Sequence, residues 1–440
     1  MAVRPNFFLN PTARGLVTLY TSTLLAGMWA MIVPAVPVLA KSFGVSAGTA
    51  AQTITAFAVG RFAGLPVSGV VLDRLGTRSA LIAGPALGCA AGLLAVSMPW
   101  FGSILALVFL MGVAESVWVI AREVAGIDLA RPDQRGRVLS GFHGVNNLGL
   151  ALGPLFGGIL TENIGFRAVF VAYAACAAAS VLIGFSVENS RPAHEPHSAS
   201  DAAKHSGRAT LMDRLRGLRI LFHQIHPDLR ATYIVLVFAT FTSFVHRVTT
   251  QSMLPLYASS KLGLTPKEVG LLFTISGFCV FTMILPAGFI IDKIGRKWAT
   301  VPSTGIPALA FLLIPFAETF FQLAVLLSFL GIANGLSLGS LATSTYDVVP
   351  PSARGRLQAA RRTAAEIGGM GAPLLGGFWP TLSMPASRSW PMRPCLCYPH
   401  FYWLSWVAKL CLDEAFKSFS IVIAVTELTG PLPRDALAWF

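Results

Sequence analysis

Long apolar runs, each about the length of one membrane crossing, are the feature that most restricts how this sequence can fold. A bilayer core about 30 Å thick is crossed by a helix of about 20 apolar residues. Runs of this kind lie near residues 16–39, 48–72, 79–98, 101–122, 139–160, 167–187, 231–256, 267–291, 298–317, 320–345 and 358–380. The sequence therefore predicts an all-α polytopic membrane protein, because helices satisfy their own backbone hydrogen bonds in lipid.

The composition excludes the main alternatives. Hydrophobic residues make up 54% of the chain and charged residues 12%, about half the charged share of a soluble protein. A soluble enzyme, a disordered protein and a coiled coil are therefore excluded. The net charge of +13 lies between apolar runs, whereas a nucleic-acid-binding protein gathers its basic residues on one face, so we expect no nucleic-acid partner.

The sequence contains no recognisable catalytic, cofactor or metal motif. There is no G-x-S-x-G, phosphate-binding loop or H-E-x-x-H pattern. The cysteines fall either inside apolar runs or in the tail, at Cys89, Cys176, Cys279, Cys395, Cys397 and Cys411. Their spacing suits neither a disulfide framework nor a zinc site. We therefore expect no enzyme activity, no cofactor and no metal.

Basic residues predict the orientation in the membrane. If the N-terminus is cytoplasmic, inner segments up to residue 380 hold 22 Lys and Arg, and outer loops hold only Lys41, Arg167, Lys261 and Lys267. Such an asymmetry is typical of positive-inside topology. The polar stretch 188–230 then becomes a cytoplasmic linker, and we expect a multi-pass protein of the cell inner (plasma) membrane with a cytoplasmic N-terminus.

The sequence also contains an internal repeat. Residues 69–78 (GVVLDRLGTR) recur as residues 288–297 (GFIIDKIGRK), 219 positions later, and the R-G-R triplet at 135–137 recurs at 354–356 with the same offset. A six-helix unit has thus been duplicated. An even number of spans separates the copies, so both have the same orientation, an arrangement found in transporters with a site at the midplane.

This organisation resembles the major facilitator superfamily, and the duplicated G-x-x-x-D-R-x-G-x-R motif carries the resemblance over residues 1–380. The resemblance implies two parallel six-helix repeats, with 12 transmembrane helices expected, 11 clear and the last aberrant. The predicted domains are an N-terminal bundle 1–187, the linker 188–230, a C-terminal bundle 231–380 and a tail 381–440. The resemblance also implies movement of a small organic solute by alternating access, and we expect the protein to be a monomer.

The motif loops are expected to act as a gate. The glycine that begins each motif, Gly69 or Gly288, should let two helices approach closely. The later glycine, Gly76 or Gly295, should permit a tight reversal of the chain. In the resembling family the loop aspartate pairs with basic residues to hold one conformation closed, and Arg122 is the expected partner of Asp73. The gate set is Gly69, Asp73, Arg74, Gly76, Arg78, Arg122, Gly288, Asp292, Gly295 and Arg296.

The fifth span carries a second motif, G-L-A-L-G-P-L-F-G-G, which combines close-packing glycines with a proline kink. Its residues are Gly149, Gly153, Pro154, Gly157 and Gly158. This pattern resembles proton-coupled drug exporters, and it favours efflux over uptake.

The fourth span departs from that pattern. Such exporters carry an arginine four residues before a glycine in this span, where this chain has Val108 before Gly112. Glu115 is the alternative candidate for proton transfer.

Polar side chains inside the spans are candidates for the substrate and proton pathway, because an ionisable group at the bilayer centre costs about 2.5–3.5 kcal/mol. They are Arg61, Glu115, His143, Asn146, His246, Arg247, Asn334 and Glu366. Glu115 and Arg61 form either a proton-sensitive pair or a structural salt bridge. Arg247 either binds an anionic substrate or pairs with Glu366. The histidines either relay protons or are structural.

Three functions remain open from the sequence. The first is a proton-coupled exporter of a small organic solute, and the second is uptake of a polar or anionic metabolite with Arg247 as the anion contact. The third is a degenerate, non-transporting membrane protein, because residues 381–440 lack the expected twelfth span.

Overall fold

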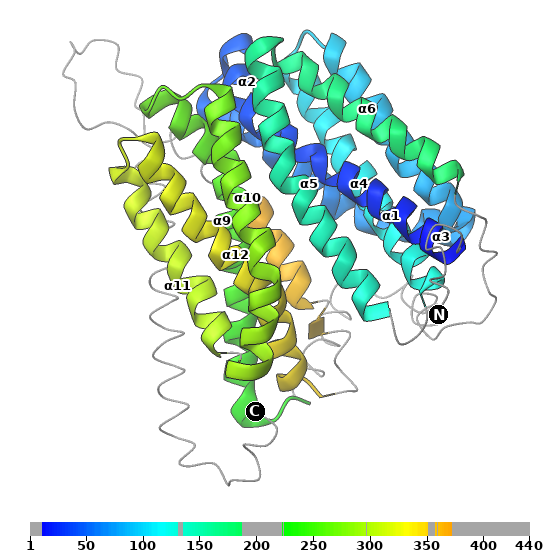
Figure 1. Ribbon diagram of the computed structural model, residues 1–440, viewed down its shortest axis with the longest axis vertical. Coiled ribbons are helices and arrows are strands. Elements are labelled where there is room, and N and C mark those ends of the chain that lie inside the picture. The colour runs from blue at the N-terminus through cyan, green and yellow to red at the C-terminus, as the bar shows by residue number, and fades with distance from the viewer. Residues whose placement is uncertain are drawn as a thin grey trace, which may run out of the picture.

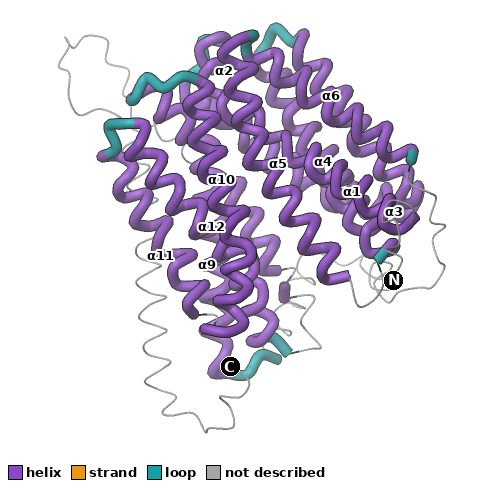
Figure 2. The backbone as a smooth tube through the Cα atoms, in the orientation of Figure 1, coloured by secondary structure: helices purple, strands orange, loops and turns teal. Residues whose placement is uncertain are grey.

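The computed structural model describes residues 11–130, 135–186, 222, 224–295, 297–350, 357–358 and 360–371. All regular structure in these residues is helical (Figure 2), which confirms the all-α prediction. Eight of the described helices are long and apolar enough to cross a membrane. The predicted count of twelve is thus confirmed only in part, and the tail 381–440, residues 188–221 of the linker and Arg296 lie outside the described residues.

The N-terminal half begins with a span built from three segments. α1 (Pro11–Gly27) continues through the 3₁₀ segment η2 (Met28–Ala35) into α2 (Val36–Phe43). The change of helix type coincides with Pro34, which cannot donate a backbone hydrogen bond to the preceding turn. The other helices of this half are α3 (Ala47–Ser97), α4 (Phe101–Leu129), α5 (Arg135–Asn163) and α6 (Phe166–Phe185).

The C-terminal half follows the same plan. Its described elements are α9 (Pro227–Lys261), α10 (Pro266–Phe289) with the π segment η3 (Ile290–Ile294), α11 (Lys297–Leu313) with η4 (Ile314–Phe316), α12 (Phe320–Val348) and the helical residues 357–358 and 360–371. Most of these bounds agree with the predicted spans to within a few residues; α4 runs seven residues beyond the predicted end at 122, and the end of the predicted span 358–380 lies outside the described residues. The long apolar runs were therefore sufficient to locate the helices.

α3 contains two predicted spans that meet at Gly76. A straight helix of 51 residues would be about 76 Å long, more than twice the bilayer core. Gly76 has φ 81° and ψ 170°, and Gly295 at the repeat position has φ 122°. Both values favour glycine, so the predicted tight reversals are confirmed.

The close helix packing expected at the start of each motif is not found. Among the described residues, no atom lies within 4 Å of a β-carbon built on Gly69 or on Gly288. Other glycines of α3, on either side of the motif, make the close contacts instead. A β-carbon on Gly64 would lie 2.6 Å from Ser116 Cβ, and one on Gly84 would lie 2.8 Å from the backbone nitrogen of Trp118. Both segments of α3 therefore pack against α4.

The duplication extends to helix ends and caps. α4 and α12 each contain 29 residues, and they begin and end 219 positions apart. Gly44 and Gly263, also separated by 219, have φ values of 60° and 65°. Each glycine precedes a capping residue, Ser46 or Thr265, whose side chain accepts a hydrogen bond from the next helix. The two halves thus share local geometry as well as sequence.

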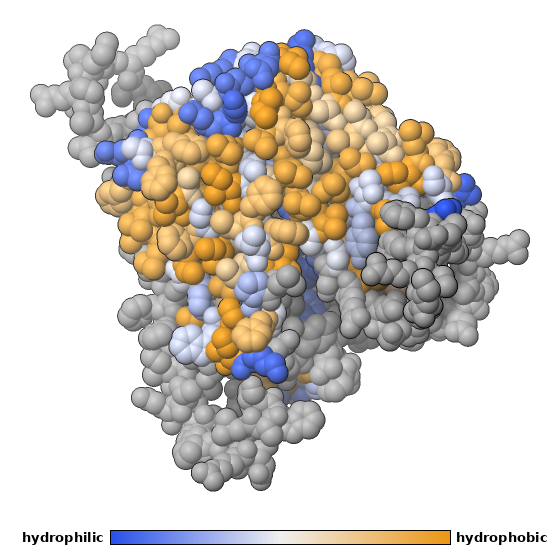
Figure 3. All heavy atoms as spheres, in the orientation of Figure 1, coloured by the Kyte–Doolittle hydropathy of each residue, from blue (hydrophilic) through white to orange (hydrophobic). Residues whose placement is uncertain are grey.

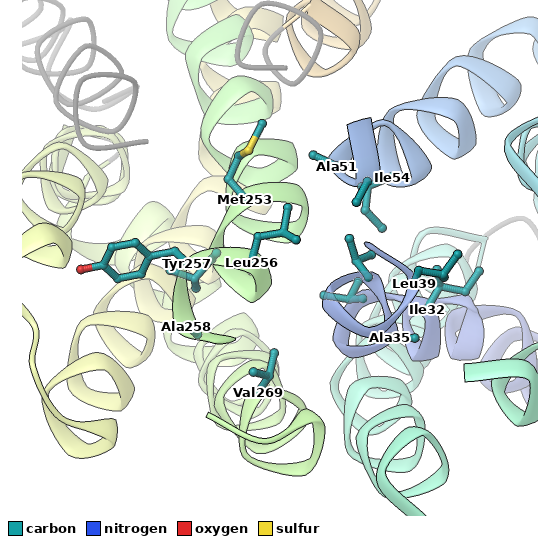
Figure 4. Packing of buried hydrophobic residues seen from close by; sticks show 14 of the residues in the cluster. Ile32, Ala35, Leu39, Ala51, Ile54, Met253, Leu256, Tyr257, Ala258 and Val269 are labelled. Carbon is teal, nitrogen blue, oxygen red and sulfur yellow. The ribbon is translucent and has the colours of Figure 1, made fainter. Parts of the chain in front are cut away.

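Among the described residues, the halves pack together chiefly at one end of the molecule (Figure 1). We name this the short-loop end, defined by residues 44–46, 98–100, 164–165, 262–265 and 317–319; the opposite motif end contains Gly76 and Gly295. The largest hydrophobic cluster lies towards the short-loop end and includes both halves. In Figure 4, Ala51 and Ile54 of α3 point towards Met253 and Leu256 of α9. Towards the motif end, each half has clusters of its own.

Apolar side chains cover much of the visible outer surface (Figure 3). Phe316, Phe321 and Leu182 are each more than two-thirds exposed. Such exposure is costly in water but expected where helices face lipid tails. The surface therefore agrees with a membrane location.

Candidate transport site

α5 lies between the first span and α10, and its motif residues divide between two faces. β-carbons built on Gly149, Gly153 and Gly157 would meet the backbone of α1 and η2. Gly158 and Pro154 instead meet the backbone of α10, at Pro266 and Gly270 respectively. Small residues on both faces let three helix backbones approach closely. The motif thus joins the two halves as well as packing the first one.

The contact between α5 and α10 reaches from the short-loop end to the middle of both helices. A β-carbon on Gly277 would lie 2.6 Å from the Ala151 Cα. At the short-loop end, Glu162 Oε2 accepts a hydrogen bond of 3.0 Å from the Lys267 backbone N–H. Lys267 lies in the first turn of α10, where unpaired N–H groups favour a carboxylate. This link was not predicted, because it joins residues far apart in sequence.

Glu115 forms the centre of the N-terminal half. Its side chain is 3% exposed, and its Oε2 atom is buried without a hydrogen-bond partner among the described residues. The charges of Arg122 and Arg61 both act on the carboxylate, that of Arg122 more strongly. The Tyr173 hydroxyl is also buried and has no hydrogen-bond partner in the part of the chain that the structure describes, and the charge of Glu115 acts on it. This is a buried polar centre with an acid at the middle of a membrane helix.

Arg122 is buried as well, and it does not bind Asp73 in this structure. Its Nη2 atom donates to Asn146 Oδ1 at 3.2 Å, while Nε and Nη1 are buried without partners among the described residues. Asp73 is exposed on α3. The structure therefore brings Arg122 together with Asn146 and the charge of Glu115, rather than with the predicted gate residue.

Arg61 and His143 lie at the edges of this centre. Arg61 is partly buried on α3, and no ion pair within 4 Å joins it to Glu115 in the described part of the chain. The side chain of His143 is exposed on α5, and its backbone oxygen accepts a hydrogen bond from Asn147. Glu115 and Arg61 therefore interact through their charges at a distance beyond 4 Å, and they do not form the direct salt bridge that was one of the predicted alternatives.

The C-terminal half has a second polar centre, between α9 and α12. Arg247 Nε donates to Asn334 Oδ1 at 2.9 Å, and its Nη2 donates to Ser337 Oγ at 2.7 Å. His246 is 2% exposed; its Nε2 lies 3.0 Å from the same Asn334 oxygen, and its Nδ1 lies 3.2 Å from the Thr242 carbonyl oxygen. Three predicted pathway residues therefore form one cluster.

Glu366 does not join that cluster. It is partly exposed on the helix that contains residues 360–371, and no ion pair within 4 Å joins it to Arg247 among the described residues. The predicted alternative of an Arg247–Glu366 pair is therefore wrong for this structure. Ser337 was missed, although its position three residues after Asn334 places both on one helix face.

The motif loop of the N-terminal half is anchored through Arg78. Its Nη2 atom donates to the Phe185 carbonyl oxygen at the end of α6, at 3.1 Å, and helix-end carbonyls are favourable partners for a cation. Arg74 is exposed. The Asp292 side chain lies outside the described residues.

Two duplicated helical units with buried polar centres near the middle of their spans are typical of membrane transporters. In the described residues, no group of three His, Cys, Asp or Glu is placed to hold a metal ion. A family profile, Major Facilitator Superfamily, matches residues 18–246 and 236–384. The chain belongs to the major facilitator superfamily, whose members matched here are transporters and not enzymes.

Two similar proteins are named for drug resistance and for citrate export. Multidrug resistance protein 2 of Bacillus subtilis (strain 168) is 24% identical over 283 residues, which are 61% of this chain and 64% of that protein. Citrate exporter 1 of Aspergillus niger is 28% identical over 138 residues, which are 31% of this chain and 26% of that protein. The matches thus span less than two-thirds of each relative.

Solved structures of transporters share the fold. A D-xylose–proton symporter matches with a TM-score of 0.70 and 16% identity, over 91% of this chain and 95% of that one. A peptide transporter, POT, matches with a TM-score of 0.74 and 14% identity, over 97% of both chains. At these identities the likeness shows the fold alone.

Proposed function

We propose that this protein is a proton-coupled secondary transporter that exports a small organic solute by alternating access. The observation that carries the proposal is the position of Glu115. This acid is buried at the centre of a membrane helix, and the charges of Arg122 and Arg61 act on its carboxylate. An acid in such a place is a functional group by default. Protonation would weaken its attraction to Arg122 and Arg61, so proton binding and conformation would be coupled.

The uneven packing of the halves supports alternating access. The shared hydrophobic cluster and the α5–α10 contact lie towards the short-loop end, whereas the motif end has separate clusters. Rocking of two rigid bundles would open one end as it closes the other. With a cytoplasmic N-terminus, the motif end faces the cytoplasm, and this conformation would load its solute from inside.

The motif loops would hold the opposite conformation. When the motif end closes, Asp73 and its repeat counterpart Asp292 would approach basic residues of the facing half. Arg78 already anchors the end of the loop to α6, so the loop would move with its own bundle. Gly76 and Gly295 keep each loop short.

Export is the direction that we favour over uptake. The fifth-span motif resembles that of proton-coupled exporters, and the α5–α10 contact gives its glycines a role between the halves. The relatives named above include a multidrug resistance protein and a citrate exporter. We further propose that the protein works as a monomer in the plasma membrane.

The test is a flux measurement in proteoliposomes that hold the full-length protein. A pH gradient is imposed, and labelled citrate and the cation ethidium are followed as probes against empty liposomes. Accumulation of either probe that depends on the gradient is expected. Gradient-independent movement would contradict proton coupling, and ligand binding without movement of either probe would indicate a degenerate carrier.

A further inference from the structure

The Arg247 guanidinium is a cation within the span that has neutral partners only. Asn334 Oδ1, the Asn334 carbonyl oxygen and Ser337 Oγ accept its hydrogen bonds. No carboxylate among the described residues lies within 4 Å of it. Neutral oxygens orient the guanidinium, but they leave its positive charge without a counter-ion, which is costly in a membrane interior.

One edge of Arg247 remains available. Its Nε and Nη2 atoms make the three hydrogen bonds, and Nη1 has no partner among the described residues. Nη1 is not among the buried unpaired atoms, and the residue is partly exposed. An arginine held through Nε and Nη2, with Nη1 open, is preorganised for an anion, because Nη1 can donate a charge-assisted hydrogen bond to a carboxylate oxygen.

The neighbouring histidine supplies no negative charge to Arg247. Both ring nitrogens of His246 lie against oxygens, at Thr242 and Asn334. A neutral imidazole can donate only one hydrogen bond, so one of these contacts lacks a proton. The local groups therefore offer no negative charge that could neutralise Arg247.

We propose that the transported solute carries a carboxylate that binds Arg247 between α9 and α12. This inference rests on the proposed transport function and names the solute class. Asn334 and Ser337 act as positioning residues, because they hold the guanidinium without neutralising it. Phe244, whose ring lies 5.8 Å from the Arg247 guanidinium carbon, covers another side of the cation.

The first test measures binding to the purified full-length protein in nanodiscs, without any gradient. Succinate, citrate and benzoate are compared with the neutral amides succinamide and benzamide. Carboxylates should bind, and R247Q should weaken their binding about 10- to 100-fold, the effect of losing a hydrogen bond to a charged group. The carboxylate affinity of R247K should lie between those of the wild type and R247Q. The control R167Q removes an exposed cation at the start of α6 and should bind as the wild type does.

A second variant keeps the arginine and supplies the missing charge. Asn334→Asp is nearly isosteric and places a carboxylate at hydrogen-bonding distance from Arg247 Nε. If the solute is the natural counter-ion, N334D should abolish carboxylate binding and raise the melting temperature, because the cation is then neutralised internally. This test does not depend on whether R247Q folds.

The inference is overturned by any of three results: no carboxylate binds the wild type, the amides bind as tightly as the acids, or N334D binds carboxylates like the wild type. Flux of ethidium without carboxylate binding would contradict this inference alone. Carboxylate binding without flux of either probe would contradict the proposed transport function alone.

Discussion

Glu115 and Asn334 occupy the same position in the two halves of the protein. Each lies at the centre of a 29-residue helix, α4 or α12, and they are 219 residues apart. Each also contacts or acts on an arginine of its own half. The duplicated scaffold has therefore diverged at its centre into an acid in one half and a neutral amide in the other, which suits a division between proton coupling and solute binding.

Replacement of Glu115 by glutamine should separate exchange from coupling. Glutamine keeps the size of the side chain but cannot change its charge, so gradient-driven accumulation should fall to the empty-liposome rate while solute exchange continues. Both are measured in proteoliposomes with the same labelled probe. The control E318Q removes an exposed carboxylate at the short-loop end and should leave both activities intact. Gradient-driven accumulation by E115Q at the wild-type rate would exclude Glu115 as the coupling group.

Two glycines of α5 should respond differently to replacement by alanine. A β-carbon on Gly158 would overlap the Pro266 backbone oxygen of α10, and overpacking of this kind costs about 1–3 kcal/mol. Gly144 has open space around it in the described structure, where alanine favours the helix by up to about 1 kcal/mol. G158A should therefore lower the melting temperature, and G144A should not. Equal effects would show that α5 and α10 pack less closely at Gly158 than the structure has them.

The motif loop offers a similar matched pair. Gly76 has φ 81° and ψ 170°, a conformation that costs a residue with a β-carbon about 1–3 kcal/mol. Gly69 is helical with nothing within 4 Å in the described structure. Thermal unfolding in detergent should therefore show G76A destabilised by several degrees and G69A unchanged or slightly stabilised. A destabilised G69A would instead restore the close-packing role predicted from the sequence.

The link between Glu162 and Lys267 should hold the short-loop end closed. E162Q keeps a hydrogen-bond acceptor but removes the charge at the start of α10, which is worth about 0.3–1 kcal/mol. Opening of this end should then be about 2- to 5-fold more populated. The readout is the rate at which an impermeant maleimide added from the short-loop side labels a cysteine at Ala151, which is buried against α10, in a cysteine-free background. With E318Q the rate should not change, and an unchanged rate in E162Q would mean that this link does not control opening.

Much of the fold could be read from the chain itself. The spans could be located because each must present about 20 apolar residues to lipid, and hydropathy along the sequence records this directly. The repeat, the reversals at Gly76 and Gly295 and the family were also predictable. These features depend on residue type and spacing, and both are visible without a structure.

The partners of the buried polar groups were decided only by tertiary structure. Arg247 bonds Asn334 rather than Glu366, and Arg122 bonds Asn146 rather than Asp73. Each choice depends on how a helix is rotated and crossed against its neighbours. Contacts such as that of Gly126 on α4 with Phe142 on α5 limit this arrangement, and they are visible only in the packed structure. A sequence shows that a charge lies within the membrane, but only the packing of helices determines which oxygen it meets.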